Sequence, residues 1–267
     1  MRFCGIVIWI TLWISQFIVE VDFAPIVRGE IVKTAHDDIK PFPFMVSLQD
    51  RVDGTYNKHF CGGSLIDKNW ILTAAHCVWR KKLTLIVAVI GYENISNVSE
   101  FYNVDRVEYI YFQPTNYQND IALLHLEASY KHPELALNRI YGKLPMYGMR
   151  ANRNRPCKII GYGATRHAGQ IQETLIEGEV KVITNKQCRG ILGNVWAPQK
   201  GENTVCALGK QDTCQGDSGG PLICNYNGRD YIYGIVSHGL TCGIVGVPSI
   251  YTVTIPYIDW IRLIVND

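Results

Sequence analysis

The sequence predicts an all-β protein, either a sandwich or barrels, with one helix at its C-terminal end. Short runs of apolar and β-branched residues recur through most of the chain and are separated by glycine-rich turns, a pattern typical of all-β domains. A chain of 267 residues with 47% hydrophobic content can bury one large core or two small ones. Only the last segment has helical spacing. Its apolar residues recur at intervals of three, one and three: Tyr257, Trp260, Ile261 and Ile264.

The expected strands fall into two groups. An irregular stretch at about residues 128–155 separates them, and its basic residues and prolines mark it as the connection between two halves. In the N-terminal half we expect strands at residues 46–48, 63–66, 70–73, 84–90, 104–112 and 121–126. In the C-terminal half we expect them at residues 157–163, 175–183, 221–224, 231–237 and 249–253.

The first 24 residues have the features of a secretory signal peptide. Arg2 provides a positive charge, and residues 3–14 are almost wholly apolar, but this run is too short for a comfortable membrane span. We expect cleavage after Ala24, although Asp22 is unfavourable near the cut, and an uncleaved anchor is the alternative. The mature protein is therefore expected to be extracellular and not attached to a membrane, with residues 25–30 as a short propeptide.

The cysteines support a secreted protein. The chain has nine, and removal of the leader with Cys4 leaves an even number, which favours four disulfides. Zinc is the alternative, but no pair shows the C-x-x-C spacing of a zinc knuckle, and counting alone does not give the pairing. Two N-glycosylation sequons, at Asn94 and Asn97, fit an extracellular surface loop.

Residues 212–221, Asp-Thr-Cys-Gln-Gly-Asp-Ser-Gly-Gly-Pro, are the densest group of chemically useful side chains. Their glycines allow tight turns that present the hydroxyl of Ser218 outward. Serine alone is a poor nucleophile, so it needs a base within hydrogen-bond reach and a group that orients that base. The sequence must supply both partners if Ser218 is to react.

His76 and Asp120 are the candidates for base and orienting group. His76 follows an apolar strand and two small alanines, and Cys77 can tether it by a disulfide to Cys61, a bridge worth roughly 3 kcal/mol. Asp120 leads directly into an apolar run, where a carboxylate must find partners because an unpaired buried charge is costly. Taken alone, Asp120 is better explained as a turn residue at the start of a strand, but the presence of His76 and Ser218 favours the orienting role.

Three segments resemble the signature blocks of the chymotrypsin-like serine proteases. They are Ala-Ala-His-Cys at 74–77, Asp-Ile-Ala-Leu at 120–123 and Gly-Asp-Ser-Gly-Gly-Pro at 216–221, in the family's order. The resemblance covers about residues 31–267. It implies two packed six-stranded antiparallel β-barrels, at about 31–140 and 141–267, with the active site between them and a C-terminal α-helix. It also implies four disulfides: Cys61–Cys77, Cys157–Cys224, Cys188–Cys206 and Cys214–Cys242.

The resemblance implies a serine endopeptidase mechanism. His76 takes the proton of Ser218 as the hydroxyl attacks a peptide carbonyl, and Asp120 orients the imidazole. The backbone N–H groups of Gly216 and Ser218 would form the oxyanion hole.

The same resemblance places Asp212 at the base of the pocket for the residue before the cleaved bond (P1). A buried carboxylate there predicts cleavage after Lys or Arg. Two positions depart from the usual family pattern: His238 replaces a tryptophan, and Ser249 replaces a pocket glycine and narrows the slot, so a small or altered P1 residue is the alternative. The expected substrate-binding residues are Asp212, Thr213, Ser237, Gly239 and Ser249.

Asp217 is implied to pair with a new N-terminal amine after processing of a zymogen. Ile31 lies 12 residues before Pro43, the commoner family spacing, and is the preferred new terminus. Glu30 precedes it, so the processing enzyme would not be trypsin-like. Ile26 begins a closer match to the usual Ile-Val-Gly-Gly start, but it lies 17 residues before Pro43.

Neither a cofactor nor a nucleic-acid partner is expected. The formal net charge of +2 gives no indication of a polyanion partner, and residues 92–96 lack the acids with which some trypsins bind calcium. The expected partners are protein or peptide substrates and protein inhibitors, and the expected state is a monomer. The rival functions are a non-catalytic homologue that acts as a binding or decoy protein, and a secreted inhibitor or disulfide module, for which the chain is long.

Overall fold

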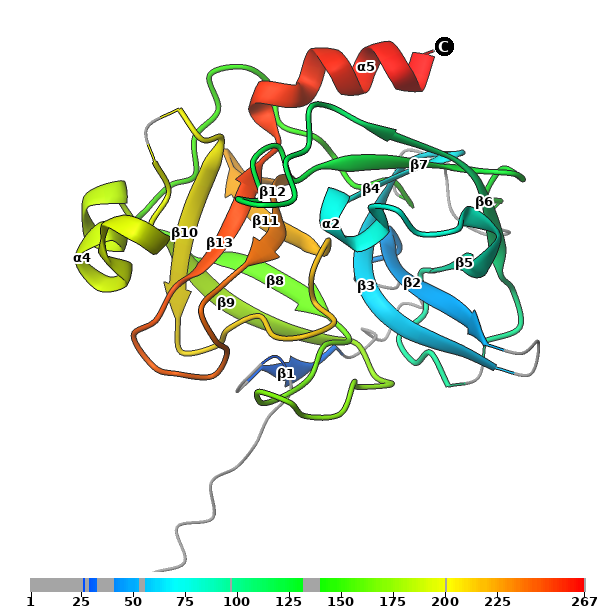
Figure 1. The fold of residues 1–267 in the computed structure, drawn as a ribbon, viewed down its shortest axis with the longest axis horizontal. Helices are drawn as coiled ribbons and strands as arrows, with labels where there is room; N and C mark the ends of the chain where they lie inside the picture. Colours follow the sequence, from blue (N-terminus) through cyan, green and yellow to red (C-terminus); the bar gives the residue numbers. More distant parts are fainter. Residues whose placement is uncertain are drawn as a thin grey trace, which may run out of the picture.

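The computed structural model describes residues 26, 29–32, 41–52, 56–96, 98–131, 140–199 and 201–266. Two closed antiparallel β-barrels lie side by side, and the C-terminal helix α5 (Ile258–Asn266) lies along one end of the molecule (Figure 1). This arrangement confirms the predicted all-β class, the two six-stranded barrels and the C-terminal helix. None of the helices in these described ranges is long and apolar enough to cross a membrane.

The first barrel has the strand order β2-β3-β4-β7-β6-β5. All residues of β4 and β5 are buried, and apart from Thr73 all of them are apolar, as expected for strands covered on both faces. Its strands are β2 (Met45–Val52), β3 (Tyr56–Asp67), β4 (Trp70–Thr73), β5 (Ile86–Ile90), β6 (Tyr102–Tyr109) and β7 (Ala122–Leu126). A short 3-10 helix, η1 (Leu83–Leu85), precedes β5.

The second barrel has the order β9-β10-β13-β12-β11-β8 and closes through pairing of β8 with β9. β9 alternates buried and more exposed residues, so one face of the strand lines the core. A two-residue strand, β1 (Glu30–Ile31), pairs with β9 outside the barrel. The barrel strands are β8 (Cys157–Gly161), β9 (Ile176–Val182), β10 (Thr204–Gly209), β11 (Pro221–Tyr226), β12 (Arg229–His238) and β13 (Ser249–Val253).

One strand and two helices differ from the expectation. Strand β10 was not predicted, and the expectation that only the C-terminus is helical was wrong, because α4 (Asn185–Trp196) and the short α2 (Ala75–Val78) are also helices. α4 starts at a capping box in which Thr184 Oγ1 accepts the Gln187 N–H at 3.1 Å, and Gln187 Oε1 accepts the Thr184 N–H at 3.0 Å. Only Cys188 and Leu192 of this helix are buried, so its apolar periodicity is weak.

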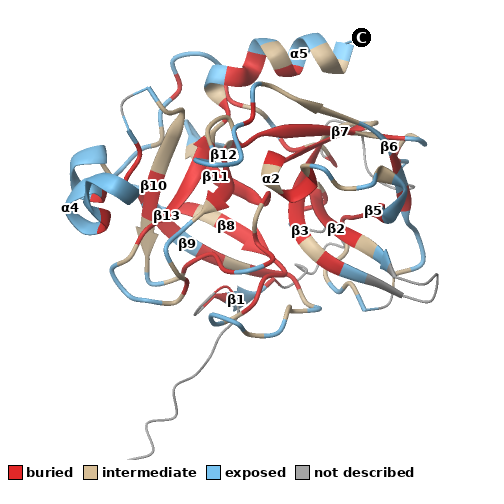
Figure 2. Cartoon of the chain, in the orientation of Figure 1, coloured by how far each residue is buried: buried red, intermediate tan, exposed pale blue. Residues whose placement is uncertain are grey.

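The cores of the two halves are joined. Side chains of β12 and of the C-terminal segment belong to the same buried cluster as the first-barrel strands, among them Ile235 and Ile261. Tyr257, in the 3-10 helix η2 (Ile255–Tyr257), donates its hydroxyl to Asn119 Oδ1 at 2.7 Å, just before β7. Figure 2 shows the strands mostly buried and the outer faces of α4 and α5 largely exposed.

Four disulfides are formed in the described residues, and they are the pairs that the resemblance implies. They are Cys61–Cys77, Cys157–Cys224, Cys188–Cys206 and Cys214–Cys242.

The barrels meet at a close backbone contact behind Ser218. The Gly62 N–H donates to the Ser218 carbonyl at 2.7 Å, and Thr73 Oγ1 donates to the Gly62 carbonyl at 2.8 Å. Gly219 has a φ of +79°, and a Cβ there would lie 2.3 Å from Thr73 Oγ1 and 2.5 Å from the Gly62 oxygen. Only glycine fits this position without displacing one barrel from the other.

We therefore expect Gly219→Ala to lower the free energy of unfolding by about 2–5 kcal/mol, since left-handed strain adds to overpacking. Gly228→Ala is the matched control, because Gly228 has a φ of +81° with nothing within 4 Å. The control should lose only the strain contribution, about 1–2 kcal/mol. Urea unfolding of both variants measures the difference, and equal losses would show that the barrel contact is not sterically constrained.

Candidate active site

A buried carboxylate holds the candidate base in place. Asp120, in the loop before β7, has no exposed surface, and its Oδ2 lies 2.7 Å from His76 Nδ1. Its Oδ1 accepts the backbone N–H of His76 at 2.8 Å, at the start of α2. Two bonds to one residue fix both the position of the short helix and the orientation of the imidazole.

Ser237 supplies a third bond to the same carboxylate. A β-bulge between Val236 and His238 leaves Ser237 outside the regular register of β12 with β13. Its Oγ donates to Asp120 Oδ2 at 2.5 Å. The sequence placed Ser237 in the pocket wall, and it does line the cleft, but its hydrogen bond to Asp120 was not expected.

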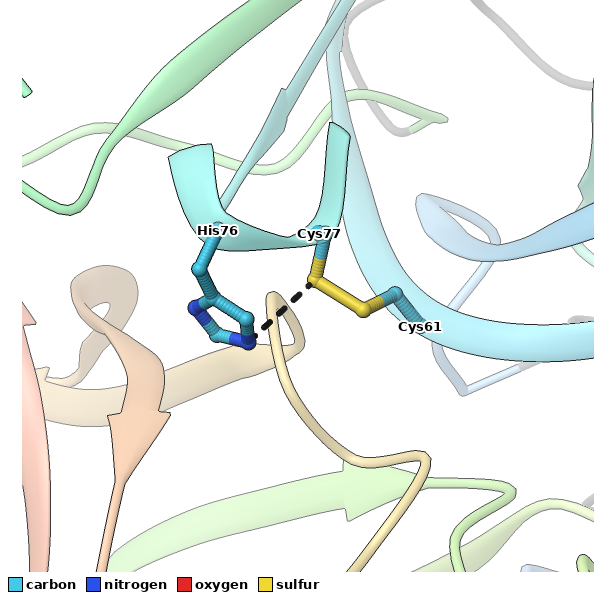
Figure 3. Close-up of side chains that lie close together, drawn as sticks. All are labelled: Cys61, His76 and Cys77. Carbon is cyan, nitrogen blue, oxygen red and sulfur yellow. Dashed lines mark hydrogen bonds between the residues drawn. A yellow bond between two sulfur atoms is a disulfide. The ribbon is translucent and has the colours of Figure 1, made fainter. Parts of the chain in front are cut away.

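The Nε2 edge of the His76 ring lies against a disulfide. His76 Nε2 is 3.7 Å from Cys77 Sγ, which is bonded to Cys61 (Figure 3). Potential ligand atoms of these three residues lie within 4.8 Å of one another. Because the two sulfurs are bonded to each other, neither is a thiolate that could bind a metal ion.

His76 and Ser218 line one cleft of about 360 Å³ between the barrels. Ser218 is partly exposed, and within the described residues its hydroxyl makes no hydrogen bond, so it is not bonded to His76 in this state. Hydrogen bonds of this kind are often long in enzymes without substrate and shorten in the substrate complex. Thr213, Gly239 and Ser249 line the same cleft.

The turn before Ser218 leaves two donors free. Gly216 has a φ of +97°, and a Cβ there would lie 2.6 Å from Ile171 Cδ1, so the turn requires glycine. The Asp217 N–H between them is used, since it donates to the Cys214 carbonyl at 3.0 Å. In the described part of the chain, the N–H groups of Gly216 and Ser218 have no acceptor. Both are therefore available to a ligand oxygen.

His59 holds this turn from behind, and sequence reasoning missed it. His59 Nε2 lies 2.9 Å from the Gly216 carbonyl oxygen, which can only accept, so Nε2 carries the proton. Nδ1 then accepts from Ser47 Oγ at 2.7 Å. Burial lowers the pKa of His59 to about 4, which keeps the ring neutral. No local motif marks His59, because its partner is 157 residues away in the sequence.

Asp212 is buried beneath the cleft. Ser249 Oγ donates to Asp212 Oδ1 at 2.7 Å, and the Gly243 N–H donates to Oδ2 at 3.2 Å. Burial raises the pKa of Asp212 to about 6, against the effect of these hydrogen bonds. Ser249 and Thr213 line the cleft and Asp212 does not, so the Ser249 hydroxyl connects the cleft wall to the carboxylate.

Asp217 is buried without a cation. Its oxygens accept the N–H groups of Gly163 and Cys214, each at 2.9 Å. Burial raises the pKa of Asp217 to about 7. No basic side chain in the described ranges pairs with it, so the site can receive a cation.

The two candidate N-terminal residues differ in burial. Ile26 has no exposed surface and belongs to the second-barrel core, where it lies close to Gly178. Ile31 is 54% exposed and paired with Ile176 through β1.

Of the two sequons, Asn94 is exposed, and Asn97 lies outside the described residues.

The buried neutral state of His59 predicts a pH dependence of stability. The folded pKa of about 4 lies below the ordinary 6.5, so the stabilising contribution is complete above pH 6.5 and is lost as pH falls through about 4. Between pH 7.5 and 4.5 the free energy of unfolding should fall by about 2–3 kcal/mol more in the wild type than in His59→Gln, whose amide can still donate to Gly216 without titrating. Urea unfolding at both pH values measures this, and equal pH sensitivity in the two proteins would contradict it.

Comparisons with known proteins agree with this geometry. The family model described as Trypsin matches residues 31–261. The chain is 34% identical over 237 residues to Chymotrypsin-like elastase family member 1 of Felis catus, covering 84% of this chain and 85% of that protein. It is 33% identical over 254 residues to the Rattus norvegicus protein of that name, covering 90% and 91%. The Homo sapiens protein is 34% identical over 236 residues, covering 84% and 88%. With its two barrels and this cleft, the chain belongs to the chymotrypsin-like serine protease family.

Proposed function

We propose that the mature chain is a secreted serine endopeptidase in which Ser218 is the nucleophile, His76 the general base and Asp120 the orienting group. The observation that carries this proposal is the cleft shared by His76 and Ser218, with His76 bonded to the buried Asp120. The four disulfides fit an oxidising compartment, and we retain glycosylation at Asn94 and Asn97 and a monomeric state as part of the proposal.

The proposed reaction has two halves. Ser218 Oγ bonds to the carbonyl carbon, its proton passes to His76 Nε2, and the oxyanion accepts from the N–H groups of Gly216 and Ser218. The C–N bond then breaks as His76 returns the proton to the leaving amine. A water molecule then attacks the acyl-enzyme carbonyl carbon as His76 takes one of its protons. The ester C–O bond breaks, His76 passes that proton to Ser218 Oγ, and the water oxygen leaves in the carboxylic acid product. Asp120 stays ionised throughout and stabilises the imidazolium.

Processing is proposed to complete the site. A new N-terminal amine would pair with Asp217, whose buried carboxylate lacks a cation in the described residues, and would stabilise the adjacent turn. The burial of Ile26 and the exposure of Ile31 favour Ile26 as that terminus. Ile31 is the alternative, supported by its spacing from Pro43 and by the start of the family match.

A serine-reactive fluorophosphonate should label the processed wild type and not Ser218→Ala, because the reagent needs an activated hydroxyl. Heat-denatured wild type is the control for non-specific labelling. Edman sequencing of the labelled protein should begin at Ile26. Absence of labelling in correctly processed protein would favour a non-catalytic binding or decoy protein, and a first residue of Ile31 would select the alternative terminus.

For specificity we propose cleavage after Lys or Arg. Asp212 is a buried carboxylate with no basic partner in the described residues, and a substrate cation would relieve its unpaired charge. One observation favours a second candidate, a small P1 residue: Ser249 lines the cleft and its hydroxyl is already bonded to Asp212, which does not line the cleft. Gly239 faces Ser249 across the entrance, where a Cβ would lie 3.4 Å from the serine oxygen.

Ser249→Gly should raise kcat/KM for a P1-Arg peptide by about 10–200-fold and leave a P1-Ala peptide little changed, because it removes the side chain that is bonded to Asp212 and widens the cleft there. In the wild type, the ratio of kcat/KM for P1-Lys to P1-Ala peptides should rise as pH increases through about 6, where Asp212 ionises. A pH effect on catalysis that is common to both peptides cancels in the ratio. A wild type that prefers P1-Ala at all pH values would establish the small-residue candidate instead.

A further inference from the structure

His238 extends the hydrogen-bond network of Asp120 by one residue. It ends β12, and its Nδ1 lies 3.0 Å from Ser237 Oγ. The Ser237 hydroxyl has one proton and gives it to the Asp120 carboxylate, which can only accept. The oxygen of Ser237 is therefore an acceptor toward His238, and Nδ1 of His238 carries the proton of that second bond.

The ring of Tyr117 lies between His238 and His76 and contacts both. Tyr117 stacks on His238 with ring centroids 4.8 Å apart and planes at 28°. The other neighbour of Tyr117 is His76, whose ring contacts it edge to face at 5.5 Å and 71°. His238 thus contacts a partner of His76 on one side and a partner of Asp120 on the other.

The surroundings of His238 keep its imidazole neutral. Burial is the largest influence and lowers its pKa, and the positive charge of His76 acts in the same direction. Asp120 and Glu202 act in the opposite direction, and Tyr117 faces the ring as an uncharged partner. A neutral imidazole with the proton on Nδ1 matches the bond to Ser237.

We propose that His238 is a positioning residue for the His76–Asp120 pair, which it supports by directing the Ser237 hydroxyl toward Asp120 and by holding Tyr117 against His76. The inference rests on the proposed serine protease function. An indole, which is usual at this position in the family, has no second ring nitrogen and cannot replace the Nδ1 donor in the same geometry. Because donors in series polarise one another, loss of the His238 bond weakens the bond that Ser237 makes to Asp120.

Substitution of His238 by Asn or by Gln distinguishes a positioning role from a role as part of the cleft wall only. The amide nitrogen of Asn occupies nearly the place of Nδ1, whereas that of Gln occupies the place of Nε2. His238→Asn should therefore retain the donor toward Ser237, and His238→Gln should lose it. The substrate is a short acyl p-nitrophenyl ester, which does not extend along the cleft to His238.

On this ester His238→Gln should lower kcat about fivefold with KM little changed, and His238→Asn should restore kcat toward the wild type. The acid limb of the kcat/KM profile should move to higher pH in His238→Gln, because a carboxylate with fewer donors holds the His76 proton more strongly. In a Ser237→Ala background the two amides should no longer differ, since the connection is absent.

Equal kcat values and equal acid limbs for the Asn and Gln variants would overturn the inference. A difference that persists in the Ser237→Ala background would overturn it as well, because the effect would not act through Ser237. Fluorophosphonate labelling of the wild type is measured in parallel. An unlabelled wild type refutes the proposed function itself, whereas a labelled wild type with equivalent amide variants refutes only the role of His238.

Discussion

The buried carboxylate of Asp120 is the charge on which the arrangement of the two barrels around the cleft depends. A carboxylate with no exposed surface is costly unless its oxygens are hydrogen-bonded, and here the donors come from both halves of the molecule. His76 contributes a backbone and a ring donor from the first barrel, and Ser237 contributes its hydroxyl from the second. A displacement of one barrel from the other would leave this charge undersatisfied. The need to hydrogen-bond the buried Asp120 carboxylate therefore fixes both the position of His76 and the walls of the cleft.

The turn around Ser218 is held by the same kind of constraint. Its carbonyl groups are anchored on the first barrel, where Gly62 donates to Ser218 and His59 donates to Gly216. The peptide units that carry the Gly216 and Ser218 N–H groups are also fixed, because the Gln215 carbonyl accepts the Ala164 N–H at 2.7 Å and the Asp217 carbonyl accepts the Gly220 N–H at 2.9 Å. The N–H groups of Gly216 and Ser218 themselves stay free in the described structure. A fixed pair of donors needs no rearrangement when charge develops on a substrate oxygen, which is the condition for efficient electrostatic stabilisation.

Much of this could be predicted from the sequence, because part of the information is local. Alternating and continuous apolar runs predicted every barrel strand except β10, and short motifs indicated the candidates His76, Asp120 and Ser218. The helix α4 was missed, although Thr184 and Gln187 form a recognisable capping box, because its two buried side chains are too few to give a helical period. His59 and the role of Ser237 could not be predicted, since each depends on a partner more than 100 residues away. The bulge that directs Ser237 toward Asp120 depends on strand register, which no local motif specifies.

Two buried titratable groups, His59 and Asp217, change the stability of the fold with pH in opposite directions. The contribution of Asp217 gives the proposed processing a physical basis. The neutral His59 stabilises the fold above pH 6.5, and that contribution is lost as pH falls through about 4. The carboxyl of Asp217 has a raised pKa of about 7, so its contribution is complete below its ordinary value of 3.8 and is lost as pH rises through about 7. Near neutral pH the single chain therefore holds Asp217 at a cost. A buried N-terminal amine would pair with this carboxylate and lower its pKa, which converts the cost into a stabilising contribution. Cleavage would then stabilise the Ser218 turn through the free energy of one buried charge.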